Sequence, residues 1–183
     1  TLVGVTKGVS VETIRQAVAL GLADLGENRV QEAQEKQSAL GSRLQALGKG
    51  GPLQPTTSSL EPLVRWHLIG HLQRNKARHA AELFDVIHSV DSLALMEALG
   101  RPQRLLEVLI QVNVSGETTK FGCRPEDAAS LAHAIAQRPQ LSLKGLMTIA
   151  PLSQDPEPAR PYFRRLRALR DRRVLPDRVR VGG

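Results

Sequence analysis

The chain has 183 residues, of which 41% are hydrophobic and 23% are charged, and its formal net charge is +7. This length and composition predict one soluble globular domain, residues 1–183, with a sizeable core. The sequence contains no run of about 18 apolar residues, so we expect no membrane span, and no signal peptide precedes the first predicted strand. The single Cys123 cannot form an internal disulfide, which suits a cytoplasmic location.

The basic charge is the one compositional sign of a nucleic-acid partner. Aromatic residues make up only 3% of the chain, so a stacking platform for single strands is absent. The excess charge falls largely in one predicted helix, at Arg160, Arg164, Arg165, Arg167, Arg170, Arg172 and Arg173. We therefore favour a solvated arginine-rich helix face and expect no nucleic-acid partner.

Apolar runs and turn residues predict strands and helices in strict alternation. The strands are predicted at 2–5, 24–28, 64–70, 84–90, 105–115, 141–150 and 178–182. The helices are predicted at 11–20, 30–47, 71–83, 92–99, 125–137 and 160–173. Residues 48–62 are rich in Gly, Pro and Ser and indicate a surface connection within the same domain.

Several helix starts carry recognisable signals. Ser10 and Asp91 are predicted to cap the helices that follow them, and Pro125 is predicted at a first helical position. The run at 105–115 is nearly continuous in leucine and β-branched residues, which is typical of a parallel strand buried on both faces.

The alternation of strands and helices favours a parallel sheet with helical crossovers. An open doubly wound sheet remains an alternative, but no GxGxxG follows the first strand, so a dinucleotide site has no support. A (β/α)8 TIM barrel fits better, because every strand ends in polar residues that would share one mouth. The chain is shorter than the roughly 250 residues of a typical barrel, and only seven strands are recognisable.

The carboxyl ends of the strands are where a barrel places its active site. They hold one lysine, Lys7, and a set of mostly neutral polar groups: Glu27, Asn28, His67, His71, His88, Ser89, Asn113, Ser115, Met147, Thr148, Arg180 and Gly182. This set has no glycosidase-type carboxylate pair and no metal-ligand spacing, so we predict no metal site. Two interpretations of Lys7 stay open at this point: an exposed amine at a strand end, or a partly desolvated amine that forms a Schiff base.

The chain resembles the pyridoxal phosphate homeostasis protein family, whose fold is similar to the N-terminal barrel of alanine racemase. The resemblance spans residues 2–171. It rests on the segments LVGVTK, GENRVQEAQEK, RWHLIGHLQRNK, IHSVDS, IQVNVSGETTKFG, GLMTIAP and DPEPARPYFRRLRALRD.

This resemblance implies that the chain holds pyridoxal 5′-phosphate as a Schiff base on Lys7. It implies a role in vitamin B6 homeostasis and amino-acid balance without established catalysis, so no residue is assigned as catalytic. Asn28 and His67 would line the cofactor ring, Met147 would pack near it, and Arg180 with Gly182 would lie near the pyridine nitrogen or the phosphate. PLP-dependent apoenzymes are the implied recipients of the cofactor, and we expect a monomer.

The sequence departs from the family pattern in three places. It lacks the helix that precedes the first strand, its connection at 41–63 is longer, and nothing matches the seventh strand with its Ser- and Gly-rich phosphate segment. Either the protein lacks that strand, or the sequence omits residues between Asp177 and Arg178. We favour the second explanation, because deleting a barrel strand leaves two exposed edges.

A PLP-dependent amino-acid racemase is the enzyme alternative. Racemisation by two bases requires a second acid/base group on the opposite cofactor face, which racemases take from a tyrosine of an added C-terminal domain. The chain has one tyrosine, Tyr162, and no such domain. We therefore expect no racemase activity.

Overall fold

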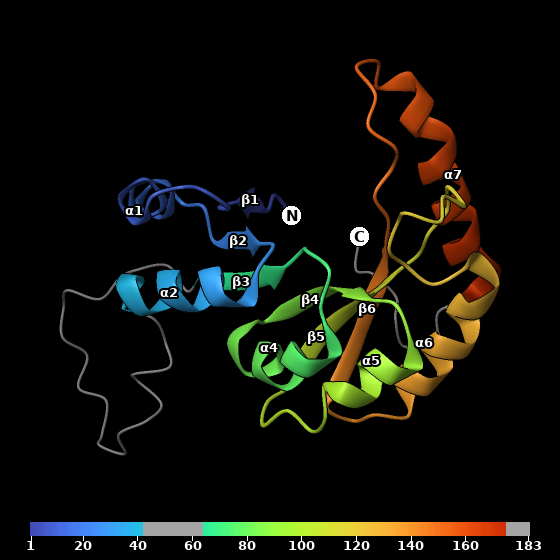
Figure 1. The fold of residues 1–183 in the computed structure, drawn as a ribbon, viewed down its shortest axis with the longest axis horizontal. Coiled ribbons are helices and arrows are strands. Elements are labelled where there is room, and N and C mark those ends of the chain that lie inside the picture. The colour runs from blue at the N-terminus through green and yellow to red at the C-terminus, as the bar shows by residue number, and fades with distance from the viewer. Residues whose placement is uncertain (42–63, 175–183) are drawn as a thin grey trace.

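The computed structural model describes residues 1–41 and 64–174, which form a parallel sheet with helices packed against its outer face (Figure 1). The strands of this sheet are β1 (Gly4–Val5), β2 (Asp24–Glu27), β3 (Arg65–Leu68), β4 (Val86–Val90), β5 (Leu106–Gln111) and β6 (Leu141–Met147). They lie side by side in chain order, and every neighbouring pair is parallel. This is the order that a (β/α)8 barrel requires of its first six strands, so the predicted parallel sheet is confirmed.

Helices follow the strands as the alternation predicted. They are α1 (Val11–Ala19), α2 (Val30–Leu40), α4 (Ala77–Leu83), α5 (Leu93–Ala98), α6 (Ala128–Ala136) and α7 (Arg160–Leu169). Short 3₁₀ turns at Arg74–Lys76, Pro125–Asp127 and Glu157–Ala159 introduce α4, α6 and α7, and a π-helical turn at Arg170–Val174 follows α7. The helix predicted to begin at residue 71 thus starts later, as a 3₁₀ turn at Arg74.

The helix caps confirm one prediction and correct another. The Ser10 hydroxyl accepts a hydrogen bond from the Thr13 backbone N–H, as predicted for the start of α1. The prediction that Asp91 caps α5 is wrong. Ser92 is the capping residue, because its backbone is extended and its hydroxyl accepts from the Leu95 N–H at 3.2 Å.

The hydrophobic core lies between the outer face of the sheet and the helices. Leu25, Leu68, Ile87 and Val108 point to this side from four neighbouring strands and are fully buried. Small residues such as Ala80 of α4 allow the helices to approach the sheet closely. The pattern follows from the alternation of side chains along each strand.

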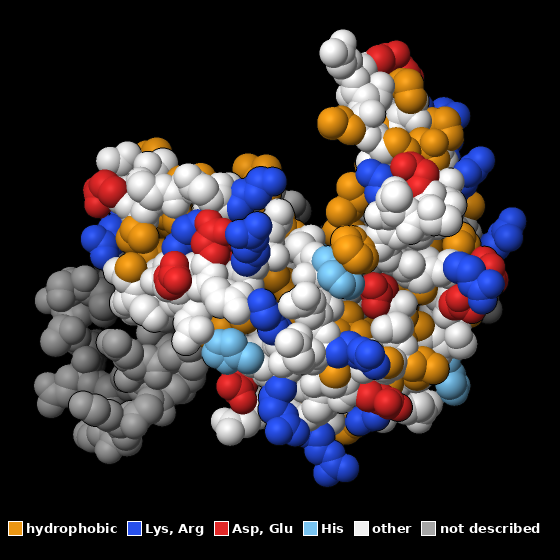
Figure 2. Space-filling view, viewed as in Figure 1, with side chains coloured by type: hydrophobic (Ala, Val, Ile, Leu, Met, Phe, Trp, Pro, Cys, Tyr) orange, Lys and Arg blue, Asp and Glu red, His pale blue; other side chains and the backbone are white. Residues whose placement is uncertain are grey.

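The inner face of the sheet is less covered than the sequence predicted. In β5, Glu107 and Leu109 are half-buried, whereas Leu106 and Val108 on the other face are fully buried. The sheet does not close within the part of the chain that the structure describes, because β1 and β6 are its two edges. Figure 2 shows the resulting hollow between the N-terminal elements and α7. The predicted burial on both faces at 105–115 therefore holds only in the second half of this stretch, where Gln111 of the inner face is buried as well as Ile110 and Val112.

Some predictions concern residues that the structure does not describe. The helix predicted at 30–47 ends earlier than predicted, at Leu40, because Gly41 takes a left-handed conformation with φ 74°, and residues 42–47 lie outside the described residues. The connection at 48–62, the junction of Asp177 and Arg178, and the strand at 178–182 also lie outside the described residues. None of the described helices is long and apolar enough to cross a membrane.

Candidate functional site

The strand register places three predicted site residues toward one face of the sheet. Val5 pairs with Gly26, and Gly26 pairs with His67, so these three positions share the inner face. Lys7 and Asn28 are the next positions of that face, just beyond the carboxyl ends of β1 and β2. Since parallel strands end at the same edge, Lys7, Asn28 and His67 come from three adjacent strands at one mouth.

Lys7 occupies the corner of a tight turn after β1. The Val9 N–H donates to the Thr6 carbonyl oxygen at 2.9 Å, and Gly8 has φ 68°, which suits a residue without Cβ. The Lys7 side chain is exposed, and its amine forms no hydrogen bond or ion pair with another residue of 1–41 or 64–174. The partial desolvation predicted for Lys7 is therefore not present in the described residues, because β1 is an edge strand there.

His67 forms the centre of a polar chain on the inner face. Its Nε2 lies 2.8 Å from Oδ1 of Asp24, and its Nδ1 lies 2.9 Å from Nε2 of His88. The Nε2–H of His67 donates to the Asp24 carboxylate, and Nδ1 of His67 shares a hydrogen bond with Nε2 of His88 whose direction depends on the tautomer. His67 is buried, and the chain fixes the direction of its ring from both sides.

The environment of His88 keeps its ring neutral. Burial, and secondly the neighbouring His67, lower the pKa of His88 from 6.5 to about 4. At neutral pH the His88 imidazole is therefore uncharged.

Asn28 is held by the close approach of two chain segments. A Cβ on Gly70 would collide with the backbone oxygen of Asn28 and would lie 2.7 Å from its Cα. Only glycine lets the segment after β3 pass this close to the segment after β2. The glycine at the end of RWHLIG thus fixes the position of a predicted cofactor residue.

Met147 reaches the inner face through an irregularity in β6. This strand carries one extra residue, Lys144, between its pairs with Val108 and Leu109. Beyond this bulge Met147 lies opposite Gln111 of the inner face. In the described sheet, Met147 lies on β6, at the opposite end of the strand order from β1 and Lys7. The other two predicted cofactor residues, Arg180 and Gly182, lie outside the described residues.

Other predicted strand-end residues have local structural partners. His71 stacks on Phe121 with ring centroids 3.7 Å apart. Asn113 binds the turn after β5 through its side chain, accepting from the Gly116 N–H at 3.0 Å. Thr148 donates to the Val112 carbonyl oxygen at 2.8 Å. These contacts account for the polarity of three strand ends without a ligand.

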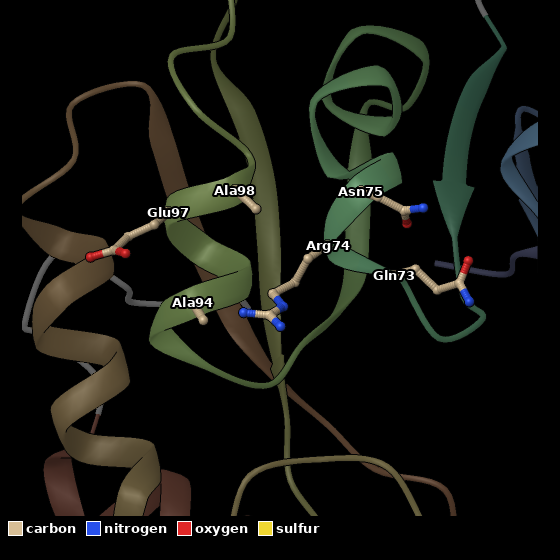
Figure 3. A pocket seen from close by; sticks show the side chains of 6 residues that line it. All are labelled: Gln73, Arg74, Asn75, Ala94, Glu97 and Ala98. Carbon is tan, nitrogen blue, oxygen red and sulfur yellow. The ribbon is translucent and has the colours of Figure 1, made fainter.

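A surface depression of about 760 Å³ lies elsewhere, between the 3₁₀ turn Arg74–Lys76 and α5 (Figure 3). Its lining residues are Gln73, Arg74, Asn75, Ala94, Glu97 and Ala98. None of these is a predicted cofactor residue. In the described ranges, no group of three or more His, Cys, Asp or Glu residues has a geometry that would hold a metal ion.

Sequence reasoning missed two groups around the site. Asp24 opens β2 and bonds to His67 across 43 positions of sequence, a contact that no local pattern indicates. Lys36 of α2 is buried and lies 2.6 Å from Oε1 of Glu27. A signal for the second pair was present, since Glu27 lies inside an apolar strand and requires a buried partner.

Comparison with known families and proteins places the chain in a clear group. Residues 4–180 match the family described as alanine racemase, N-terminal domain. The chain is 41% identical to the pyridoxal phosphate homeostasis protein of Pseudomonas aeruginosa. The match extends over 172 residues and covers 92% of this chain and 66% of that protein. The chain thus spans about two thirds of the length of this relative.

Solved structures show the same fold. PipY of Synechococcus elongatus PCC7942, solved without and with PLP bound, matches with TM-scores of 0.77 and 0.75 at 35% identity. These matches cover 94% of this chain and 74% and 73% of the PipY chains. Alanine racemase of E. faecalis matches with a TM-score of 0.68 at 15% identity, covering 97% of this chain and 44% of that enzyme. The racemase match shows a shared barrel fold and no more.

Proposed function

We propose that this chain, which belongs to the alanine racemase N-terminal domain family and within it to the pyridoxal phosphate homeostasis proteins, holds pyridoxal 5′-phosphate on Lys7. The observation that carries the proposal is the Lys7 amine at the carboxyl edge of β1, which has no partner among residues 1–41 and 64–174. PipY, 35% identical, has been solved with PLP bound, which supports the same ligand here. When bound, the cofactor supplies an aldehyde with which a primary amine condenses, releasing water.

The residues present suit such a ligand. Lys7 is accessible and is free of any carboxylate partner among the described residues, so its amine is not held in an ion pair. Asn28 and His67 follow on the next two strands and are fixed from behind by Gly70 and by the Asp24–His67–His88 chain. A ring placed over this part of the inner face would meet preoriented hydrogen-bonding groups.

The remaining assignments are proposals that rest on the family. Met147 would pack against the cofactor, and Arg180 with Gly182 would bind near its pyridine nitrogen or phosphate. An arginine beside the pyridine nitrogen keeps that nitrogen unprotonated and weakens the cofactor as an electron sink, which suits a carrier.

We further propose a carrier role in vitamin B6 supply and amino-acid balance, with PLP-dependent apoenzymes as recipients and a cytoplasmic monomer as the working form. The only cysteine, Cys123, is buried, and desolvation raises the pKa of its thiol to about 11. It is therefore an unreactive thiol.

Two alternatives have less support. For a racemase, Tyr162 would have to act as an acid/base, but it packs half-buried against the core with the Arg165 guanidinium 5.9 Å from its ring centroid. For a nucleic-acid module, the arginines of α7 and the turn after it would have to be free. Arg160, Arg167 and Arg170 instead pair with acidic residues of the same stretch.

The test is chemical labelling of the purified protein. We expect PLP to produce a visible absorption band, and borohydride to fix one equivalent of cofactor on the peptide that contains Lys7. Labelling spread over surface lysines with no band would contradict the proposal.

A further inference from the structure

A buried charge network lies directly behind the turn that carries Lys7. Lys36 of α2 is only 7% exposed, and Glu27 at the end of β2 is fully buried. The Lys36 ammonium lies 2.6 Å from Oε1 of Glu27 and 2.8 Å from Oε1 of Glu32. Burial acts to lower the pKa of Lys36, but its hydrogen bonds to Glu27 and Glu32 outweigh this and raise it, so the ammonium stays charged.

The network bonds to the residues on both sides of Lys7. The Lys36 ammonium also donates to the Thr6 carbonyl oxygen at 2.6 Å. The Thr6 hydroxyl donates to Oε1 of Glu27 at 2.6 Å. On the other side of Lys7, the Gly8 N–H donates to Oε1 of Glu32 at 2.9 Å. Within Thr6–Gly8, the network therefore binds Thr6 and Gly8 but makes no hydrogen bond to Lys7.

We propose that Lys36, with Glu27 and Glu32, is a positioning device that holds the turn Thr6–Val9 so that the Lys7 amine is presented at the mouth of the sheet. The role rests on the proposed function, since it is the attachment of the cofactor that requires a fixed amine. Lys36 itself lies on the outer side of β1 and β2, where it contacts the backbone next to Lys7.

The geometry distinguishes this role from simple attachment of α2 to the sheet. Hydrophobic contacts such as those of Val30 and Ala33 already bury α2 against the core. A buried ion pair is in general weak evidence for stability, because desolvation offsets most of its attraction. Within the described residues, the strand β1 has only two residues and one neighbouring strand, so its exit turn has few other constraints there.

Loss of the network should change both the mobility of the turn and the affinity for the cofactor. Without the network, the turn gains conformational freedom that cofactor binding must then remove, which corresponds to about tenfold weaker binding for one ordered residue. The amides of Gly8 and Val9, which donate to Glu32 and to Thr6, would exchange with solvent about tenfold faster by the same reasoning.

The experiment uses the full chain with the double substitution Glu27→Gln/Lys36→Met, which removes the pair without leaving a buried charge. Lys144→Met is the matched control, since Lys144 also pairs with a strand carboxylate, Glu107 at 3.2 Å, but has no contact with the turn. Should the double variant not fold, Glu32→Ala removes the acceptor for Gly8 through a partly exposed side chain.

Two readouts are taken on each protein. Amide exchange without cofactor should rise at Gly8 and Val9 in the network variants and stay at the wild-type rate in Lys144→Met. PLP titration followed by borohydride should show about tenfold weaker binding and a label that moves from Lys7 to other lysines. The Lys36→Arg variant should keep part of the slow amide exchange and part of the PLP affinity of the wild type, because arginine keeps the charge and the hydrogen-bond donors.

The outcomes separate the two proposals. Unchanged exchange, or faster exchange with wild-type affinity and labelling of Lys7, overturns the positioning role and leaves the proposed function intact. A wild-type protein that takes no label on Lys7 overturns the proposed function and the positioning role together.

Discussion

His67 and His88 share a hydrogen bond on the inner face of the sheet, with 2.9 Å between Nδ1 of the first and Nε2 of the second. Their rings meet edge to face, with centroids 5.1 Å apart and an interplanar angle of 61°. The far side of His67 is bound to Asp24, so one carboxylate sets the direction of both imidazoles. A proton added to His88 would place a charge in a partly buried site beside the ring of His67.

This arrangement predicts acid sensitivity between pH 6.5 and 4. The pKa of His88 is about 4 in the folded protein and near 6.5 when unfolded, so the unfolded chain binds more protons in this window. The stability present above pH 6.5 is therefore lost as the pH falls toward 4, by at most about 3 kcal/mol and less where solvent reaches the ring. Urea unfolding at several pH values measures this loss.

Substitution identifies the group responsible. His88→Gln should flatten the dependence of unfolding free energy on pH in that window. His133→Gln, an exposed position on α6, should leave it as in the wild type. An equal pH dependence in wild type and His88→Gln would exclude His88 as the source.

The close approach at Gly70 predicts a steric effect on Asn28. Gly70→Ala would push its Cβ into the backbone of Asn28, which cannot move as a side chain can, and should cost about 1–3 kcal/mol of stability. Gly26→Ala is the matched comparison, because its Cβ would meet only the side-chain ends of Val3 and Ile69 at 3.0 and 3.2 Å. Thermal unfolding and PLP affinity of the two variants are compared.

We expect Gly70→Ala to weaken cofactor binding more than Gly26→Ala does. Equal effects on binding would show that the position of Asn28 is unimportant for the ligand.

Much of the fold was predictable, because the strands are apolar runs that end at polar residues. The runs at 24–28 and 64–70 correspond to β2 and β3 within two residues at each end. The sequence could not show which strand-end groups bind one another, as the Asp24–His67 bond illustrates. The spacing of Glu32 and Lys36, four residues apart on a helix, likewise does not show that Lys36 turns inward to the buried carboxylate of Glu27.

The cap of α5 shows how two neighbouring signals compete. Asp91 and Ser92 are both good N-cap residues, and only the backbone angles decide between them. The orientation of Met147 depends on the bulge that adds one residue to β6, and the one sequence signal for this bulge, Gly145 inside the strand, did not enter the prediction of that strand.

The carrier role predicts negligible racemase activity. Because Tyr162 packs against the core under Arg165, it is not a free acid/base for the cofactor, and Tyr162→Phe should leave any trace of D-alanine formation unchanged. Chiral chromatography of L-alanine incubated with PLP-loaded protein measures this. Robust D-alanine formation that disappears in Lys7→Ala would replace the carrier role with an enzyme.

The attachment of the cofactor to Lys7 is the central claim, and one measurement tests it most directly. Wild type, Lys7→Ala and the control Lys120→Ala are each incubated with PLP, scanned for visible absorption, reduced with borohydride and digested for peptide mass analysis. We predict the band and a labelled Lys7 peptide in wild type and Lys120→Ala, and neither in Lys7→Ala. A Lys7→Ala protein that keeps the same band and an equal amount of reducible label would contradict the account.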